Sequence, residues 1–198
     1  MRGGAHGSRP AGYYSPEGFG DVLREVWLAP GKFFRRLDPE GTPIRPALFA
    51  TIVLYSNLIL GELLRAVWRL EFNYGLIYAA LPGLVVSLIL APLLVAGLSA
   101  LVLTVLDGAP SRRKFGPVFR ALGYATAIGF VLWIPYAPLL ALPYGLYVAT
   151  VAVKEALYIS WRRAAAATLL PLGAVLLILL LLTGPEAAYQ LLINPPGE

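Results

Sequence analysis

Long apolar runs without a charged side chain are the feature that most constrains this sequence. Residues 83–106 and 164–183 contain no Asp, Glu, Lys or Arg. A helix of about 20 apolar residues is long enough to cross the roughly 30 Å hydrocarbon core of a bilayer. Charged residues make up only 14% of the chain, whereas soluble domains carry roughly a quarter. The sequence therefore predicts an all-α, polytopic bundle of transmembrane helices.

Five spans are expected along the chain. The first begins at Pro46, a favourable first helical position. Apolar residues 76–82 precede the second, and we expect them to lie along the interface until Pro82 turns the chain inward. The prolines of the IPYAP sequence separate the third span from the fourth, because proline removes a backbone donor and restricts its neighbour. The spans are expected at residues 46–68, 83–106, 116–134, from the IPYAP break to about 160, and 164–183.

The segment before the first span is amphipathic. Phe19, Val22 and Val26 recur at helical spacing, with Asp21 and Arg24 on the other side. We expect this N-terminal segment to lie in the headgroup boundary; a helix packed on the cytosolic loops is the alternative. The chain then divides into a disordered tail (1–16), the interfacial amphipathic segment (17–40), the five-span domain (41–185) and an external C-terminal tail (186–198).

Basic residues alternate along the chain in a way that predicts its orientation. The six segments outside the five spans carry 7, 2, 4, 0, 3 and 0 Lys or Arg in order. The positive-inside rule places the richer segments in the cytosol. The prediction is an integral protein of a prokaryotic inner or plasma membrane, with its N-terminus cytosolic and its C-terminus external.

Several chemistries are excluded by composition. The chain has no cysteine, and its one histidine, His6, lies in the Gly-rich start. This leaves no ligand set for zinc and no histidine base at membrane depth. Asp21, Asp38 and Asp107 all fall outside the expected spans, which excludes an aspartyl pair in the membrane. We therefore expect no enzyme activity, no metal and no cofactor, and the clustering of basic residues between apolar runs argues against nucleic acid.

Ionisable residues near the spans are the candidate functional positions, because charge is costly in lipid. Arg120 and Glu155 are expected at matching depth on antiparallel spans, either as a structural pair that extends to the headgroups or as part of a polar recess open to the cytosol. Residues at helical spacing on the fourth span support the recess. The predicted cluster comprises Arg120, Tyr147, Thr150, Lys154, Glu155 and Tyr158.

A second set of basic residues lies near the expected inner boundaries. Each basic residue close to an anionic leaflet contributes about 1 kcal/mol. We expect apolar insertion of Trp27, Phe33 and Phe34 beside them; the alternative is that these charges only set topology. The predicted headgroup contacts are Arg35, Arg36, Arg112, Arg113, Lys114, Arg162 and Arg163.

Small and polar residues inside the spans predict helix packing. Small side chains every four residues let helix backbones approach closely, within one bundle or across a dimer. A buried Asn, such as Asn57, more often bonds a neighbouring helix than a substrate. The two small-residue stripes are Gly83, Ser87 and Ala91, and Ala121, Ala125 and Gly129.

The order of these features resembles the Yip family, the Ypt/Rab-interacting integral membrane proteins, in its prokaryotic form. The resemblance covers about residues 22–183 and rests on LAPGKFFRRL, then LDGAPSRRKFGPVFRALGYATA, the IPYAP turn, and KEALYISWRRAAAATLLP before the last span. It implies a five-span domain with a cytosolic N-terminus, whose eukaryotic relatives bind prenylated small GTPases in vesicle transport. This chain lacks their acidic, Tyr-Gly-Pro-containing cytosolic motif.

The function expected from these features is a non-enzymatic, cytosol-facing membrane organiser or adaptor. Its expected partners are anionic lipids, a cytosolic protein or a second copy of the chain. The alternative is a transporter or channel for a small solute or lipid, with a polar pathway lined by the fourth span.

Overall fold

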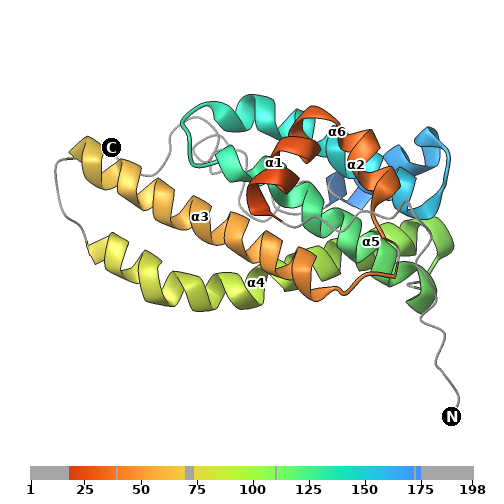
Figure 1. Cartoon of the computed structure of the whole chain (residues 1–198), viewed down its shortest axis with the longest axis horizontal. Helices are drawn as coiled ribbons and strands as arrows, with labels where there is room; N and C mark the ends of the chain where they lie inside the picture. The colour runs from red at the N-terminus through yellow and green to blue at the C-terminus, as the bar shows by residue number, and fades with distance from the viewer. Residues whose placement is uncertain (1–17, 39, 70–73, 110, 172, 175–198) are drawn as a thin grey trace, which may run out of the picture.

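The computed structural model describes residues 18–38, 40–69, 74–109, 111–171 and 173–174 (Figure 1). Every regular element in these residues is a helix, as the apolar runs predicted. The elements are α1 (Phe19–Leu28), α2 (Pro30–Arg36), α3 (Ile44–Arg69), α4 (Tyr74–Asp107), α5 (Arg112–Ala125), the 3-10 helix η1 (Thr126–Val131) and α6 (Ala137–Leu157). Residues 161–171 are also helical.

Three of the described helices are long and apolar enough to cross a membrane: Ile44–Trp68 in α3, Ala80–Asp107 in α4, and Ala137–Leu157, which is α6. They correspond to the first, second and fourth expected spans. The fifth expected span lies largely outside the described residues. The protein is therefore an all-helical membrane protein with three candidate spans in its described part.

The longest of these helices, α4, lies antiparallel to α3 along its length (Figure 1). The small-residue stripe predicted for packing is buried here: Gly83, Ser87 and Ala91 are all inaccessible. The large side chains on the other faces of α4 are exposed, among them Leu84, Val85, Val86, Leu88, Ile89 and Leu90. An exposed apolar surface of this extent fits lipid rather than water as the solvent.

The predicted turn at Pro82 is wrong. Helix α4 runs unbroken through Pro82 and Pro92, so residues 76–82 extend the span and do not form a separate interfacial segment. A helix tolerates a proline in a membrane when the freed carbonyl groups find other partners. At 34 residues and 1.5 Å per residue, α4 is about 51 Å long and extends beyond a 30 Å hydrocarbon core.

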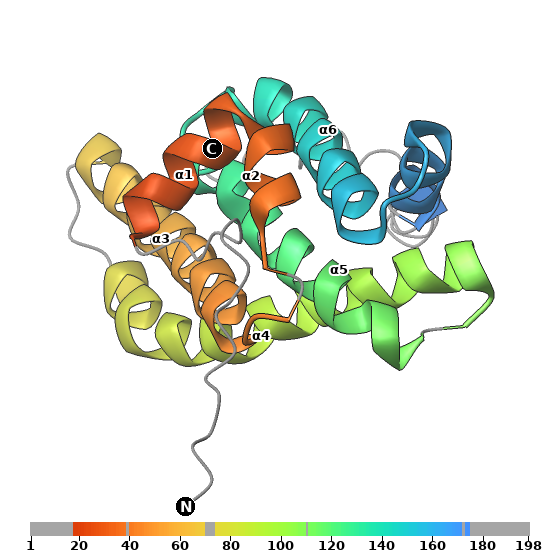
Figure 2. The ribbon, with the colours of Figure 1, turned by 45° about the vertical axis from the view of Figure 1, so that its right-hand side comes forward.

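Helix α5 lies at the centre of the bundle, in contact with α3, α4 and α6 (Figure 2). Each residue from Val118 to Ala125 is buried. The approach to α3 is close, because a Cβ added at Gly123 would lie 2.8 Å from the Pro46 Cβ and 3.1 Å from its carbonyl oxygen. Only glycine allows this contact without movement of the backbone.

The third expected span, 116–134, takes a different form from the others. It begins as α5 and continues directly into the 3-10 helix η1. The Nδ2 of Asn57 donates hydrogen bonds to the Gly129 carbonyl at 2.7 Å and to the Val53 carbonyl at 2.9 Å. The expectation that Asn57 bonds a neighbouring helix is confirmed, and this bond ties η1 to α3.

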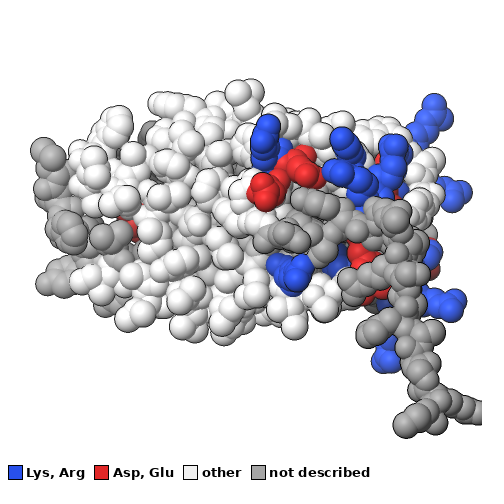
Figure 3. Space-filling view, in the orientation of Figure 1, with Lys and Arg blue, Asp and Glu red and all other residues white. Residues whose placement is uncertain are grey.

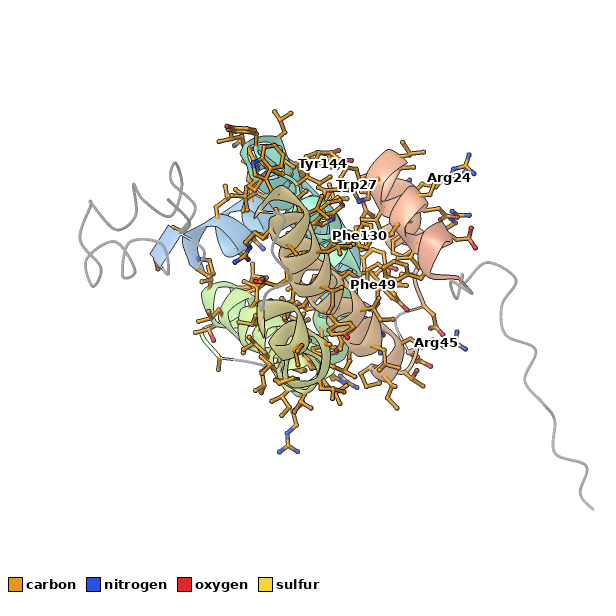
Figure 4. All side chains as sticks on the ribbon, turned by 90° about the vertical axis from the view of Figure 1, so that its left-hand side faces the viewer. Arg24, Trp27, Arg45, Phe49, Phe130 and Tyr144 are labelled. Atoms are coloured by element: carbon orange, nitrogen blue, oxygen red, sulfur yellow. The ribbon has the colours of Figure 1, made fainter. Side chains whose placement is uncertain are left out.

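The amphipathic segment forms α1 and α2, which pack on the bundle side by side (Figure 2). Val26 and Phe33 are fully buried, and Phe34 nearly so. The ring of Phe19 on α1 contacts those of Phe49 and Phe130, with centroids 4.9 Å and 5.8 Å away; Figure 4 labels the latter two. The expected insertion of Phe33 and Phe34 into lipid is therefore wrong, because the protein already buries them.

Charged side chains are unevenly distributed over the molecule. In the face drawn in Figure 3, the charges gather over α1, α2 and the end of the bundle where α3 begins and α4 ends, while the opposite half is nearly free of them. Burial of a charge in lipid is costly. The apolar half of this face is therefore the part suited to the hydrocarbon core.

Candidate functional site

A small hollow opens at the charged end of the bundle, where the end of α2, the start of α5 and the end of α6 meet. The space enclosed within it is about 20 Å³, and its mouth is open. That is room for a water molecule or one small polar group, and not for a whole lipid or a large solute. Its lining residues are Phe34, Leu37, Asp38, Pro117, Arg120, Glu155, Ala156 and Tyr158.

Arg120 is the buried cation of this hollow. Its residue is 7% exposed, because it lies on the central helix α5 under the turn that follows α2. One terminal nitrogen, Nη1, donates a hydrogen bond to the Gly41 carbonyl. Among the described residues, the buried Nε has no hydrogen-bond partner. A buried guanidinium with an unused donor is costly to desolvate, so the described contacts compensate the burial of Arg120 only in part.

Glu155 is the buried anion of the same hollow, with a side chain only 10% exposed. Two cations compensate it. The Nζ of Lys154 lies 2.6 Å from its Oε1, and the Nε of Arg35 lies 3.5 Å from its Oε2. The Arg35 pair joins α2 to α6 at the mouth, and its arginine is 70% exposed. Glu155 is thus satisfied by its neighbours without any contribution from Arg120.

Arg120 and Glu155 both line the hollow, so the structure brings together the two residues that the sequence analysis expected at matching depth. The structure gives no direct ion pair between them. The carboxylates of Asp38 and Glu40 attract the Arg120 guanidinium, Asp38 the more strongly. Neither forms an ion pair with Arg120. The hollow therefore holds opposite charges that are close but not paired. Contact between Arg120 and Glu155 through water stays a prediction.

The other predicted members of the polar cluster do not join this hollow, except Tyr158. The Thr150 hydroxyl is buried and donates to the Leu146 carbonyl of its own helix. The Tyr147 ring stacks on Tyr144 and contacts Trp161, each with centroids 5.8 Å apart. Neither residue is among those that line the hollow, and a continuous polar recess along α6 stays a prediction.

The predicted headgroup contacts fall into two groups. Three form ion pairs: Arg35 with Glu155 at 3.5 Å, Arg36 with Glu25 at 3.1 Å, and Lys114 with Asp107 at 2.9 Å. Exposed residues form the second group, namely Arg112, Arg113, Arg162 and Arg163, which lie at the start of α5 and just after α6. This second group is available to meet a headgroup or a partner protein.

Sequence reasoning missed the acidic turn between α2 and α3. Asp38 lines the hollow, and the Gly41 carbonyl accepts the bond from Arg120. The Asp38 Oδ1 also accepts the backbone N–H of Glu40 at 2.9 Å, which is the geometry of an Asx turn. The DPEG sequence is a recognisable turn signal, but nothing in it indicates that the turn folds over a residue about 80 positions later.

Comparison with known proteins gives one match. A family model, described as the Yip1 domain, matches residues 24–183. No curated protein and no solved structure matches the chain. The matched region begins within α1 and includes all three candidate spans, the hollow and the turn that covers it.

Proposed function

The chain belongs to the Yip1 domain family of membrane proteins, and on that premise we propose that it is a non-enzymatic membrane organiser whose charged end binds anionic lipid. The observation that carries this proposal is the exposed basic cluster at that end. Arg112 and Arg113 begin five residues after the candidate span α4 ends at Asp107, and Arg162 and Arg163 begin five residues after α6 ends at Leu157. Basic clusters beside a span favour anionic headgroups.

The proposed topology has five spans, with the charged end in the cytosol and the C-terminus outside. The form of the third span supports it. The 14 residues of α5 rise about 21 Å at 1.5 Å each, which is too short for a bilayer. The six residues of η1 add about 12 Å at 2.0 Å each. Together they reach about 33 Å, enough to cross the core.

The central position of α5 accounts for its polar composition. A helix that faces lipid must be apolar, whereas a helix enclosed by other helices is shielded from it. Because α3, α4 and α6 surround α5, Arg120 and Tyr124 on this helix are covered by protein. Because α5 has only 14 residues, length and hydropathy alone do not mark it as a span.

The packed α1 and α2 supply a second surface at the charged end. Their apolar faces are turned into the bundle, so the polar side chains Asp21 and Arg24 are exposed. A polar surface that is held in place by packing on the bundle suits a cytosolic partner protein. This is the adaptor part of the proposal. A transporter is less favoured, since the Tyr147 ring contacts Trp161, the Thr150 hydroxyl bonds its own helix, and neither residue lines the described hollow.

Native mass spectrometry of the purified protein tests the lipid proposal. The protein is extracted from bilayers that contain equal amounts of phosphatidylglycerol and phosphatidylcholine, and the lipids that it retains are counted. We expect a preference for phosphatidylglycerol that falls severalfold in the Arg112→Gln, Arg113→Gln double variant. A matched control, Arg65→Gln, alters an exposed charge at the other end of α3 and should leave the preference unchanged. Equal retention of both lipids by the unaltered protein would refute the proposal.

A further inference from the structure

The hollow at the charged end holds a cation that forms no ion pair with any of the described residues. Arg120 is nine-tenths buried, has one described hydrogen-bond acceptor in the Gly41 carbonyl, and keeps Nε without a partner. Buried charges in proteins are normally paired with a counter-charge or with fully formed hydrogen bonds. Neither condition is met here by the described residues.

The charges around Arg120 indicate the sign of a missing ligand. Lys154 and Arg35 both pair with Glu155, so these two cations exceed that carboxylate by one charge. Arg120 and Asp38 carry opposite charges and attract each other, but they form no ion pair. The carboxylate of Glu40 also acts on Arg120, but this residue is exposed and solvent screens its charge. Arg35 is 70% exposed and is screened in the same way. Without these two exposed groups the charges balance, Arg120 and Lys154 against Asp38 and Glu155, and Arg120 is the cation among them without an ion pair, which suits an anion of at most one negative charge.

The position of the hollow indicates where that charge comes from. It lies where α6 ends, beside the turn that leads into α3, and two of its lining groups, Phe34 and Leu37, are apolar. The exposed ring of Tyr158, 75% accessible, stands at its rim. Tyrosine is enriched at the level of lipid headgroups. The mouth admits a small group attached to a larger molecule outside.

We propose that this hollow binds the phosphate of a phosphodiester lipid headgroup, with Arg120 as the phosphate ligand and Arg35 at the mouth. This inference rests on the proposed binding of anionic lipid and assigns that binding a site. Guanidinium groups suit phosphate because their planar donors match its oxygens. A phosphodiester carries one negative charge, whereas a phosphate monoester carries about −1.5 to −2 at pH 7. Asp38, on the wall of the hollow, disfavours the second charge.

The test uses the full chain in bilayer nanodiscs with phosphatidylglycerol, phosphatidic acid or phosphatidylcholine, and native mass spectrometry counts the retained lipids. We expect phosphatidylglycerol to be retained about tenfold more than phosphatidic acid. Arg120→Gln should abolish this retention, and Arg120→Lys should keep part of it. The control Arg65→Gln removes an exposed charge at the other end of α3 and should have less than a twofold effect.

A second variant keeps the test decisive if Arg120→Gln does not fold. Asp38→Asn removes the opposing carboxylate, so it should raise retention of phosphatidic acid severalfold, while Glu40→Gln, at an exposed acid in the same turn, should not. Equal effects of Asp38→Asn and Glu40→Gln would show that binding depends on the overall charge of this end and not on the hollow, and would overturn the assignment. So would retention that Arg120→Gln leaves intact in a folded protein, which would mean that the hollow holds water only.

Two further outcomes distinguish a lipid phosphate from a soluble one, and the assignment of the site from the proposed function. Soluble glycerophosphoglycerol at millimolar concentration should compete weakly, because it lacks the acyl chains that hold a lipid at the mouth; complete displacement would identify a soluble phosphodiester as the ligand and overturn the lipid assignment. If the unaltered protein prefers phosphatidylglycerol but Arg120 variants behave normally, the site assignment fails and the proposed function stands. If the unaltered protein shows no preference, both fail.

Discussion

The Tyr144 hydroxyl donates a 2.6 Å hydrogen bond to the main-chain carbonyl of Trp27. The bond joins the middle of α6 to the end of α1, across 117 positions in the sequence. The Trp27 indole N–H in turn donates to the Ala127 carbonyl at 3.1 Å, and Figure 4 shows the two rings side by side. These contacts hold the amphipathic segment against η1 and α6 of the bundle.

Loss of this bond should loosen α1 and α2 without unfolding the bundle. Tyr144→Phe removes the donor and leaves the Trp27 carbonyl without it, at a cost of about 1 kcal/mol. Hydrogen exchange of residues 19–36 should accelerate, while exchange in α4 stays unchanged. Tyr158→Phe, at an exposed ring, is the matched control. Unchanged exchange in the Tyr144 variant would mean that apolar burial alone seats the segment.

Gly123 should tolerate no side chain. Gly123→Ala places a methyl group 2.8 Å from the Pro46 Cβ, so α3 and α5 must separate, at a cost of about 1–3 kcal/mol. The loss should appear as a lower thermal midpoint in detergent. Gly97→Ala, where no atom lies within 4 Å of the added group, provides the control and should be neutral or slightly stabilising. Equal midpoints for the two variants would contradict the close packing described.

Arg120 and Glu155 should be energetically coupled through the hollow that they share. In a double-mutant cycle of Arg120→Gln and Glu155→Gln, we expect a coupling of about 0.5–3 kcal/mol, the range for residues within one polar network. A parallel cycle of Arg112→Gln with Glu155→Gln should give none, because Arg112 is exposed on the first turn of α5 and lies outside the hollow. Additive losses in the first cycle would show that the two charges act independently.

The outer helices could be predicted from the sequence because their apolar runs face lipid. Helix α4, with its buried small residues and exposed large ones, has the simplest pattern. Helix α5 was harder, because a central helix is shielded and can carry Arg120 and Tyr124. The continuation of α4 through Pro82 was missed, since local breaker signals do not report whether neighbouring groups satisfy the freed carbonyls.

The hollow was only partly predictable. The matching depth of Arg120 and Glu155 follows from their distances to the ends of antiparallel helices. Asp38 and Gly41 join the site through a tertiary fold of the turn after α2, which no local pattern encodes. Phe33 and Phe34 illustrate the same limit, because amphipathic spacing identifies an apolar face but does not distinguish lipid from protein as the surface that buries it.

The five-span topology, with the charged end in the cytosol, is the claim on which the lipid proposals depend. Its most direct test is labelling of single cysteines, which this cysteine-free chain allows without background. Ser111→Cys lies in the basic loop before α5, and Gly197→Cys lies near the C-terminus. A membrane-impermeant maleimide added to sealed, right-side-out vesicles should label Gly197→Cys and reach Ser111→Cys only after permeabilisation. Labelling of both positions from the same side would mean an even number of spans between the basic end and the C-terminus, and would contradict the account.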